Sequence, residues 1–180
     1  MLFIAFASKN KINKIMGNKI LSNLTFIIRV INNFIRDSKY GGKFLGHKAI
    51  KTRYAHIGAH NIANSGYAEL EKYFAQLDVT NSDVLVDIGC GKGRVINFWL
   101  QKYPSNQIIG IEIDPDVAAF TSNRLSKYSN VSIVCGSAID LFPDKGTIFY
   151  LYNPFSEAVT KQFFDLLLTK TDDHHEINVV

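Results

Sequence analysis

A glycine-rich turn directly after an apolar segment is the feature that most constrains how this chain can fold. Residues 84–88 are apolar except for Asp87, a pattern typical of a strand buried on both faces of a parallel sheet. Gly89, Gly91 and Gly93 follow, and glycines let the backbone turn sharply and approach a ligand closely. The sequence therefore predicts a ligand-binding turn at the end of a buried strand.

A helix and a second strand are expected after this turn. Residues 94–103 have a helical pattern, and residues 108–113 return to an apolar strand. Glu112 lies 19 residues after Gly93, close to the ~20 expected for an acid that bonds ribose hydroxyls. Together these features outline a binding site for a nucleoside cofactor.

The rest of the domain alternates strands with helices, which predicts an α/β fold with a doubly wound parallel sheet. Asp114 precedes Pro115 and is a plausible helix cap. Further strands are expected at 131–135, 147–152 and 176–180, and helices at 67–77, 115–128 and 157–169.

The segment Asp87-Ile-Gly-Cys-Gly-Lys-Gly93 resembles the first motif of the class I S-adenosylmethionine-dependent methyltransferases. In that family the acid and the glycines contact the amino acid end of the cofactor, so the resemblance implies S-adenosyl-L-methionine and a Rossmann-like methyltransferase sheet. The alternative is a nicotinamide oxidoreductase, which the glycine spacing disfavours because dinucleotide-binding turns have the spacing G-x-G-x-x-G.

The remaining cofactor contacts are expected where the second and third strands end. In the family, the loop after the third strand often has an acid that contacts the adenine amine. Ser137 occupies that place here, so adenine recognition is expected from backbone groups and from stacking on Ile113. The expected cofactor-binding residues are Tyr67, Asp87, Gly89, Cys90, Gly91, Gly93, Glu112, Ile113, Ser137, Ala138 and Asn153.

The segment Asn153-Pro154-Phe155 resembles the Asn/Asp-Pro-Pro-Tyr/Phe motif of methyltransferases that act on amines, with one proline missing. The resemblance implies that Asn153 and a neighbouring backbone carbonyl hold the target nitrogen while Phe155 packs against the acceptor. Fixed carbonyl dipoles stabilise the positive charge that develops on a methylated amine. The alternative is a structural Asn-Pro turn with Phe155 in the core.

The stretch from Tyr67 to Phe155 resembles poorly characterised bacterial methyltransferases, which are distantly similar to the class I lysine methyltransferases of the histone core. The expected reaction is methylation of an amine, with protein lysine as one acceptor. A nucleic-acid amino methyltransferase and a cofactor-binding remnant without catalysis are the alternatives. Because the chain ends at Val180, we expect a sheet truncated after its fifth strand.

Basic residues are concentrated at the N-terminal end of the chain. Residues 1–54 contain eleven Lys or Arg and one acid, a net charge of +10, whereas the remainder has nine basic and fifteen acidic residues, a net charge of −6. Apolar residues recur every three or four positions between Ile12 and Ile35, which predicts an amphipathic helix. We expect a helical extension and linker over 1–50 and a cofactor-binding domain over 51–180. Residues 10–36 are expected to pack on the domain, on a second copy or on a membrane surface.

Cysteine and histidine positions add little to the functional interpretation. Cys90 and Cys135 have no paired spacing, so a reducing, cytoplasmic compartment is favoured. His56 and His60 are four residues apart without an apparent third ligand, and no metal site is predicted.

Overall fold

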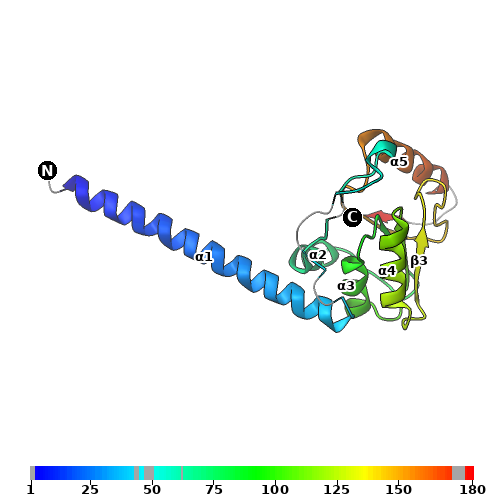
Figure 1. Ribbon diagram of the computed structural model, residues 1–180, viewed down its shortest axis with the longest axis horizontal. Helices are drawn as coiled ribbons and strands as arrows, with labels where there is room; N and C mark the ends of the chain where they lie inside the picture. The colour runs from blue at the N-terminus through cyan, green and yellow to red at the C-terminus, as the bar shows by residue number, and fades with distance from the viewer. Residues whose placement is uncertain (1–2, 43–44, 47–50, 62, 172–176) are drawn as a thin grey trace.

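A computed structural model of the chain shows one long helix that projects from an α/β domain (Figure 1). The structure describes all residues except 1–2, 43–44, 47–50, 62 and 172–176, and leaves the side chains of residues 3–20 and 170–171 undescribed. The projecting helix is α1 (Phe3–Lys39), which meets the domain only near its C-terminal end. The predicted helical extension is thus longer than the apolar pattern indicated.

Within the described residues, five parallel strands form the sheet, in the order β3-β2-β1-β4-β5. This arrangement confirms the predicted fold class. The strands at 84–88 and 131–135 were predicted to the residue, and β5 is shorter than expected within the described part of 176–180. The strands are β1 (Val84–Ile88), β2 (Gln107–Glu112), β3 (Val131–Cys135), β4 (Ile148–Leu151) and β5 (Asn178–Val179).

Helices cover both faces of the sheet, because successive residues of a strand point to opposite sides. Leu85 packs against one set of helical side chains, including Phe74 and Trp99. The neighbouring Val86 packs on the other face with Phe163. The helices that follow α1 are α2 (Tyr67–Phe74), α3 (Arg94–Lys102), α4 (Pro115–Leu125) and α5 (Glu157–Thr171), with a short 3-10 helix η1 at Ala55–Ile57.

The cap predicted for α4 is present. The Asp114 carboxylate accepts hydrogen bonds from the amides of Asp116 (3.0 Å) and Val117 (3.4 Å), and Pro115 is the first helical residue. Both α2 and α4 end three residues before the positions expected from their apolar patterns. These ends differ because the residues that follow form tight turns whose apolar side chains still face the core.

The last turn of α1 is part of the domain interior. Asp37 is fully buried and forms a bidentate ion pair with Arg94, with N···O distances of 3.0 and 2.7 Å. Tyr40 and Leu45 are also buried, although they lie in the expected linker and before the expected boundary at residue 51. Deletion of residues 1–38 would therefore remove Asp37 and leave Arg94 buried without its partner.

This ion pair generates a prediction about stability. Asp37→Asn keeps the side-chain volume but leaves the Arg94 charge uncompensated in the interior, so we expect a loss of about 3–5 kcal/mol in the free energy of unfolding. Urea denaturation measures this loss. As a control, Arg29→Gln removes the exposed ion pair with Glu69 and should cost less than about 1 kcal/mol. Equal effects of the two substitutions would show that the Asp37–Arg94 pair does not hold the helix to the domain.

Candidate functional site

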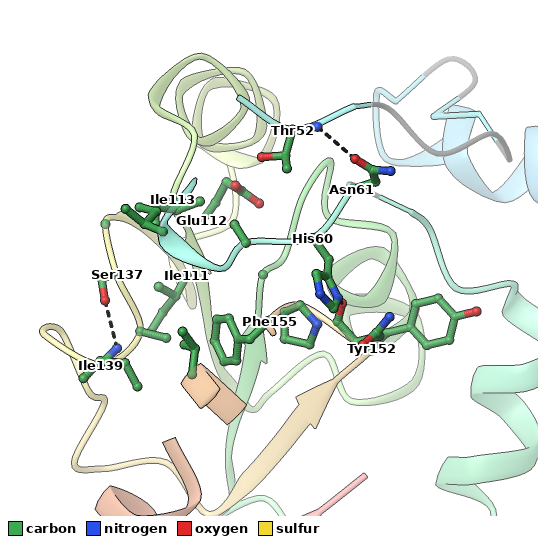
Figure 2. Close-up of a pocket in the computed structure, with 18 of the residues that line it drawn as sticks. Thr52, His60, Asn61, Ile111, Glu112, Ile113, Ser137, Ile139, Tyr152 and Phe155 are labelled. Atoms are coloured by element: carbon green, nitrogen blue, oxygen red, sulfur yellow. Dashed lines mark hydrogen bonds between the residues drawn. The ribbon is translucent and has the colours of Figure 1, made fainter. Parts of the chain in front are cut away.

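A cavity of ≈ 360 Å³ lies at the C-terminal ends of the central strands, the edge at which ligands bind in open parallel sheets (Figure 2). Its floor is formed by the ends of β1 and β2, and its sides by the loops after β3 and β4. A segment from the N-terminal part of the chain closes the remaining side. The residues expected at the site that line this cavity are Gly89, Glu112, Ile113, Ser137, Ala138, Asn153, Pro154 and Phe155.

Glu112 is the acid at the end of β2 and is only 4% exposed. Its two carboxylate oxygens accept hydrogen bonds from the backbone amides of Gly91 (2.8 Å) and Asp114 (2.9 Å). Burial raises the pKa of Glu112 despite these bonds. A carboxylate can accept about four hydrogen bonds, so Glu112 joins the glycine turn to the start of α4 and retains capacity for ligand hydroxyls.

Asp87 lines a small inner pocket of ≈ 20 Å³ that shares Gly89 and Tyr152 with the main cavity. The residue is 3% exposed, and its Oδ2 atom has no hydrogen-bond partner in the part of the chain that the structure describes. Burial raises the pKa of Asp87 well above its usual value, and the nearby charge of Glu112 raises it further. A buried carboxylate oxygen without a partner is costly, and a cationic ligand group would remove that cost.

The glycine turn brings backbone close to both cavities. Gly89 has a φ of 72°, and a Cβ at this position would lie 2.8 Å from the Cβ of Pro154. Only glycine therefore lets the first strand's turn lie against the turn after β4. Cys90 lines the inner pocket but not the main cavity, and burial raises the pKa of its thiol well above the usual value. Gly91 and Gly93 shape the turn without lining the main cavity.

The loop after β3 supplies the wall opposite the glycine turn. The Ser137 hydroxyl accepts a hydrogen bond from the Ile139 amide at 3.2 Å, as Figure 2 shows. Ile113 is half-buried on the neighbouring wall. Asp140, three residues after Ser137, also lines the cavity and was not identified from the sequence. Its position within the same short loop was the signal that could have identified it.

The turn after β4 has a strained backbone at its second residue. Asn153 has a φ of 48°, a left-handed conformation that Asn tolerates better than most residues. Such strain is often found at functional sites. Phe155 lines the cavity and also packs on Phe163, with ring centroids 6.0 Å apart. The Phe155 ring thus lies between the cavity and the core.

Residues 52–61, which we name the cover segment, cross over the cavity (Figure 2). At one end, Arg53 forms ion pairs with Asp114 (3.0 Å) and Asp116 (2.7 Å). At the other, the Ser156 amide donates to the Gly58 carbonyl at 2.6 Å. No local pattern in the sequence predicts this segment, because its position depends on pairing with residues about a hundred positions later in the chain.

His60 belongs to the cover segment, and its imidazole contacts the turn after β4 (Figure 2). Its amide donates to the Pro154 carbonyl at 2.9 Å, and its ring Nδ1 lies 3.2 Å from the Asn153 carbonyl oxygen. A carbonyl oxygen only accepts hydrogen bonds, so Nδ1 carries the hydrogen. In the neutral ring, Nε2 then holds a lone pair that can accept a hydrogen bond or a proton.

Tyr67 lies away from the cavity. It is fully buried at the start of α2, and its hydroxyl donates to Asp37 Oδ1 at 3.0 Å. Tyr67 thus helps to hold α1 to the domain. No group of three or more His, Cys, Asp or Glu able to hold a metal ion occurs among the residues that the structure describes.

The raised pKa of Asp87 generates a prediction about pH. A carboxyl group that holds its proton more tightly when folded stabilises the fold below the ordinary aspartate pKa of about 3.9, and this contribution is lost as pH rises through the folded-state value. The ligand-free wild type should therefore lose more stability between about pH 4.5 and about pH 7.5 than Asp87→Asn, whose amide does not ionise. Urea denaturation at both pH values measures the difference. Parallel losses in the two proteins would show that Asp87 is not penalised by burial.

Comparison with known proteins identifies relatives of this fold. The family model described as "Putative methyltransferase" matches residues 81–147. A tRNA (guanine-N(7)-)-methyltransferase from Actinobacillus pleuropneumoniae is 29% identical over 132 residues, which cover 63% of this chain and 53% of that protein. The ribosomal RNA small subunit methyltransferase H of Coprothermobacter proteolyticus is 36% identical over 76 residues, covering 42% of this chain and 25% of that protein. The chain thus spans about half of the length of the first relative and a quarter of the length of the second.

Among solved structures, an RNA methyltransferase from Salinibacter ruber in complex with S-adenosyl-L-homocysteine superposes with a TM-score of 0.52. The two are 22% identical, and the match covers 60% of this chain and 71% of that one. The sheet order and these similarities confirm the resemblance inferred from the sequence. The chain has the fold of the class I S-adenosylmethionine-dependent methyltransferases.

Proposed function

We propose that this chain is an S-adenosylmethionine-dependent methyltransferase that methylates a nitrogen atom of a nucleic acid. The observation that carries the proposal is the pair of buried acids, Asp87 and Glu112, at the ends of adjacent strands beside one cavity. The experiments below test cofactor binding and methyl transfer separately.

The charges of the site suit this cofactor. Asp87 has an unpartnered oxygen in the inner pocket, where it can accept hydrogen bonds from an ammonium group. Glu112 can accept hydrogen bonds from ribose hydroxyls in the main cavity. Two buried acids with raised pKa values favour a cationic ligand and disfavour the diphosphate of a dinucleotide. The nicotinamide alternative therefore fits the site less well.

The cofactor supplies an electrophilic methyl group, and the turn after β4 positions the acceptor. Asn153 lines the cavity beside the glycine turn, where its amide oxygen can orient a nitrogen nucleophile. Most of the acceleration would come from holding nucleophile and methyl group in line. His60 Nε2 accepts a hydrogen bond or a proton from that nitrogen, since Nδ1 faces the Asn153 carbonyl.

The engagement of two carbonyls by His60 bears on which nitrogen is methylated. The carbonyls of Asn153 and Pro154 already accept from the His60 side chain and amide. To hold the two protons of a lysine amine, these carbonyls would have to accept further hydrogen bonds through their remaining lone pairs. The curated relatives are named for tRNA guanine and for ribosomal RNA, so we place a nucleobase nitrogen before protein lysine as the acceptor.

Cofactor binding is testable by isothermal titration calorimetry. Glu112→Gln should weaken S-adenosylmethionine binding by about 1–3 kcal/mol, because a charged acceptor for buried hydroxyls is lost. Glu71→Gln on α2, outside the cavity, is the matched control and should bind as the wild type does. Equal affinities of the two variants would remove Glu112 from the site. Tighter binding of NAD than of S-adenosylmethionine would overturn the proposal.

Methyl transfer is testable with labelled S-adenosylmethionine and total RNA. Asn153→Gly retains the left-handed backbone but removes the amide, so we expect unchanged cofactor affinity and turnover lower by roughly a hundredfold. Ribonuclease and protease treatment of the labelled products identifies the acceptor class. Label that survives ribonuclease but not protease would replace nucleic acid by protein while leaving the cofactor assignment intact. Normal turnover in Asn153→Gly would make the turn structural.

A further inference from the structure

Helix α1 attaches to the domain through a polar face. Its ion pairs with the domain are Arg29–Glu69, Arg36–Glu71 and Asp37–Arg94. Toward the N-terminus the helix leaves the domain and extends away from it (Figure 1). The domain therefore covers one face of the last turns of α1 and leaves the opposite face in solvent.

The solvent-facing side of the described part of α1 is apolar. At about 100° per residue, six large aliphatic residues occupy an arc of about 120° centred opposite Asn33, which faces the domain, while the exposed Phe26 and Phe34 lie outside this arc. Each of the six aliphatic side chains is between 51% and 63% exposed. A continuous exposed stripe of large aliphatic residues marks an interaction surface. We name it the α1 stripe, and its members are Leu21, Leu24, Ile27, Ile28, Ile31 and Ile35.

The charges of α1 decide which partner fits the stripe. Residues 1–36 contain six Lys or Arg and no acid. Two such helices packed along their stripes would bring like charges together without the acidic partners that coiled coils place beside the seam. An apolar stripe with an acid-free, basic surround instead matches the boundary between anionic headgroups and acyl chains.

We propose that α1 lies on the surface of an anionic lipid bilayer, with the α1 stripe among the acyl chains and its lysines near the headgroups. No helix in the described part of the chain is long and apolar enough to cross a membrane. The proposal is independent of the methyl acceptor, because the stripe faces away from the catalytic domain. It would place the cavity near a membrane surface.

The test uses the full-length chain and sedimentation with vesicles of phosphatidylcholine, with or without one third phosphatidylglycerol. The wild type should bind the anionic vesicles at least about tenfold more tightly than the neutral ones. Leu24→Gln, Ile28→Gln and Ile31→Gln combined should reduce binding to anionic vesicles by about tenfold or more. Lys11→Gln, Lys14→Gln and Lys19→Gln combined should weaken binding and its dependence on salt.

The matched control is Asn23→Gln with Asn32→Gln, which introduces the same residue at exposed positions outside the stripe. This control should bind as the wild type does, and urea denaturation verifies that every variant keeps a folded domain. Equal binding by the stripe variant and the control would overturn the proposal. A dimer by light scattering that the stripe variant abolishes would identify a second copy as the partner. Binding to tRNA that depends on the stripe, without binding to vesicles, would identify nucleic acid; either result also overturns the proposal.

Discussion

The buried ion pair between Asp37 and Arg94 joins the end of the long helix to the start of α3, 57 residues later in the chain. Arg94 is the first residue of α3 and directly follows the glycine turn, so its position fixes the turn from behind. Asp37 also accepts hydrogen bonds from the Tyr67 hydroxyl and the Leu45 amide. Removing two charges from water is costly, and the additional hydrogen bonds offset part of that cost. The Asp37 carboxylate thus joins the long helix to α2 and to the residue that follows the ligand-binding turn.

Arg124 extends this polar network to the other side of the turn. Its guanidinium donates to the carbonyls of Lys92 (2.6 Å) and Tyr40 (2.8 Å), and to the Asn97 amide oxygen (2.8 Å). The glycine turn is thus held by cationic groups on its outer side and by the Glu112 carboxylate on the cavity side. This distribution leaves negative charge facing the ligand and positive charge facing the interior, which explains why the site suits a cation.

Local patterns in the sequence were sufficient for the sheet and for the ends of two of its strands. The segments 84–88 and 131–135 have strong apolar patterns with clear turns on either side, and Asp114-Pro115 is a specific helix start. The positions of the glycine turn and of Glu112 were predicted from the same local patterns. Elements of this kind are determined by neighbours in the sequence, so they can be identified before any tertiary contact is known.

The features that the sequence did not indicate depend on distant partners. Tyr67 lies outside the cavity because its hydroxyl is paired with Asp37, 30 residues earlier. His60 reaches the site through pairing with the turn after β4, 93 residues later. The linker expected before residue 51 contains core residues for the same reason, since Tyr40 packs on elements that follow much later and the Leu45 carbonyl accepts a hydrogen bond from Asn64. Neither periodicity nor motif spacing encodes such contacts.

The two ends of the cover segment are attached by forces of different kinds, and this difference bears on how quickly ligands exchange. Arg53 is 62% exposed in its ion pairs with Asp114 and Asp116, so dissolved salt screens that attachment. The backbone hydrogen bonds at Gly58 and His60 carry no net charge and are insensitive to salt. Rising ionic strength should therefore loosen the Arg53 end first, while the end held by backbone hydrogen bonds stays in place. Exchange of a ligand in the cavity would then depend on salt through a residue that does not line the cavity.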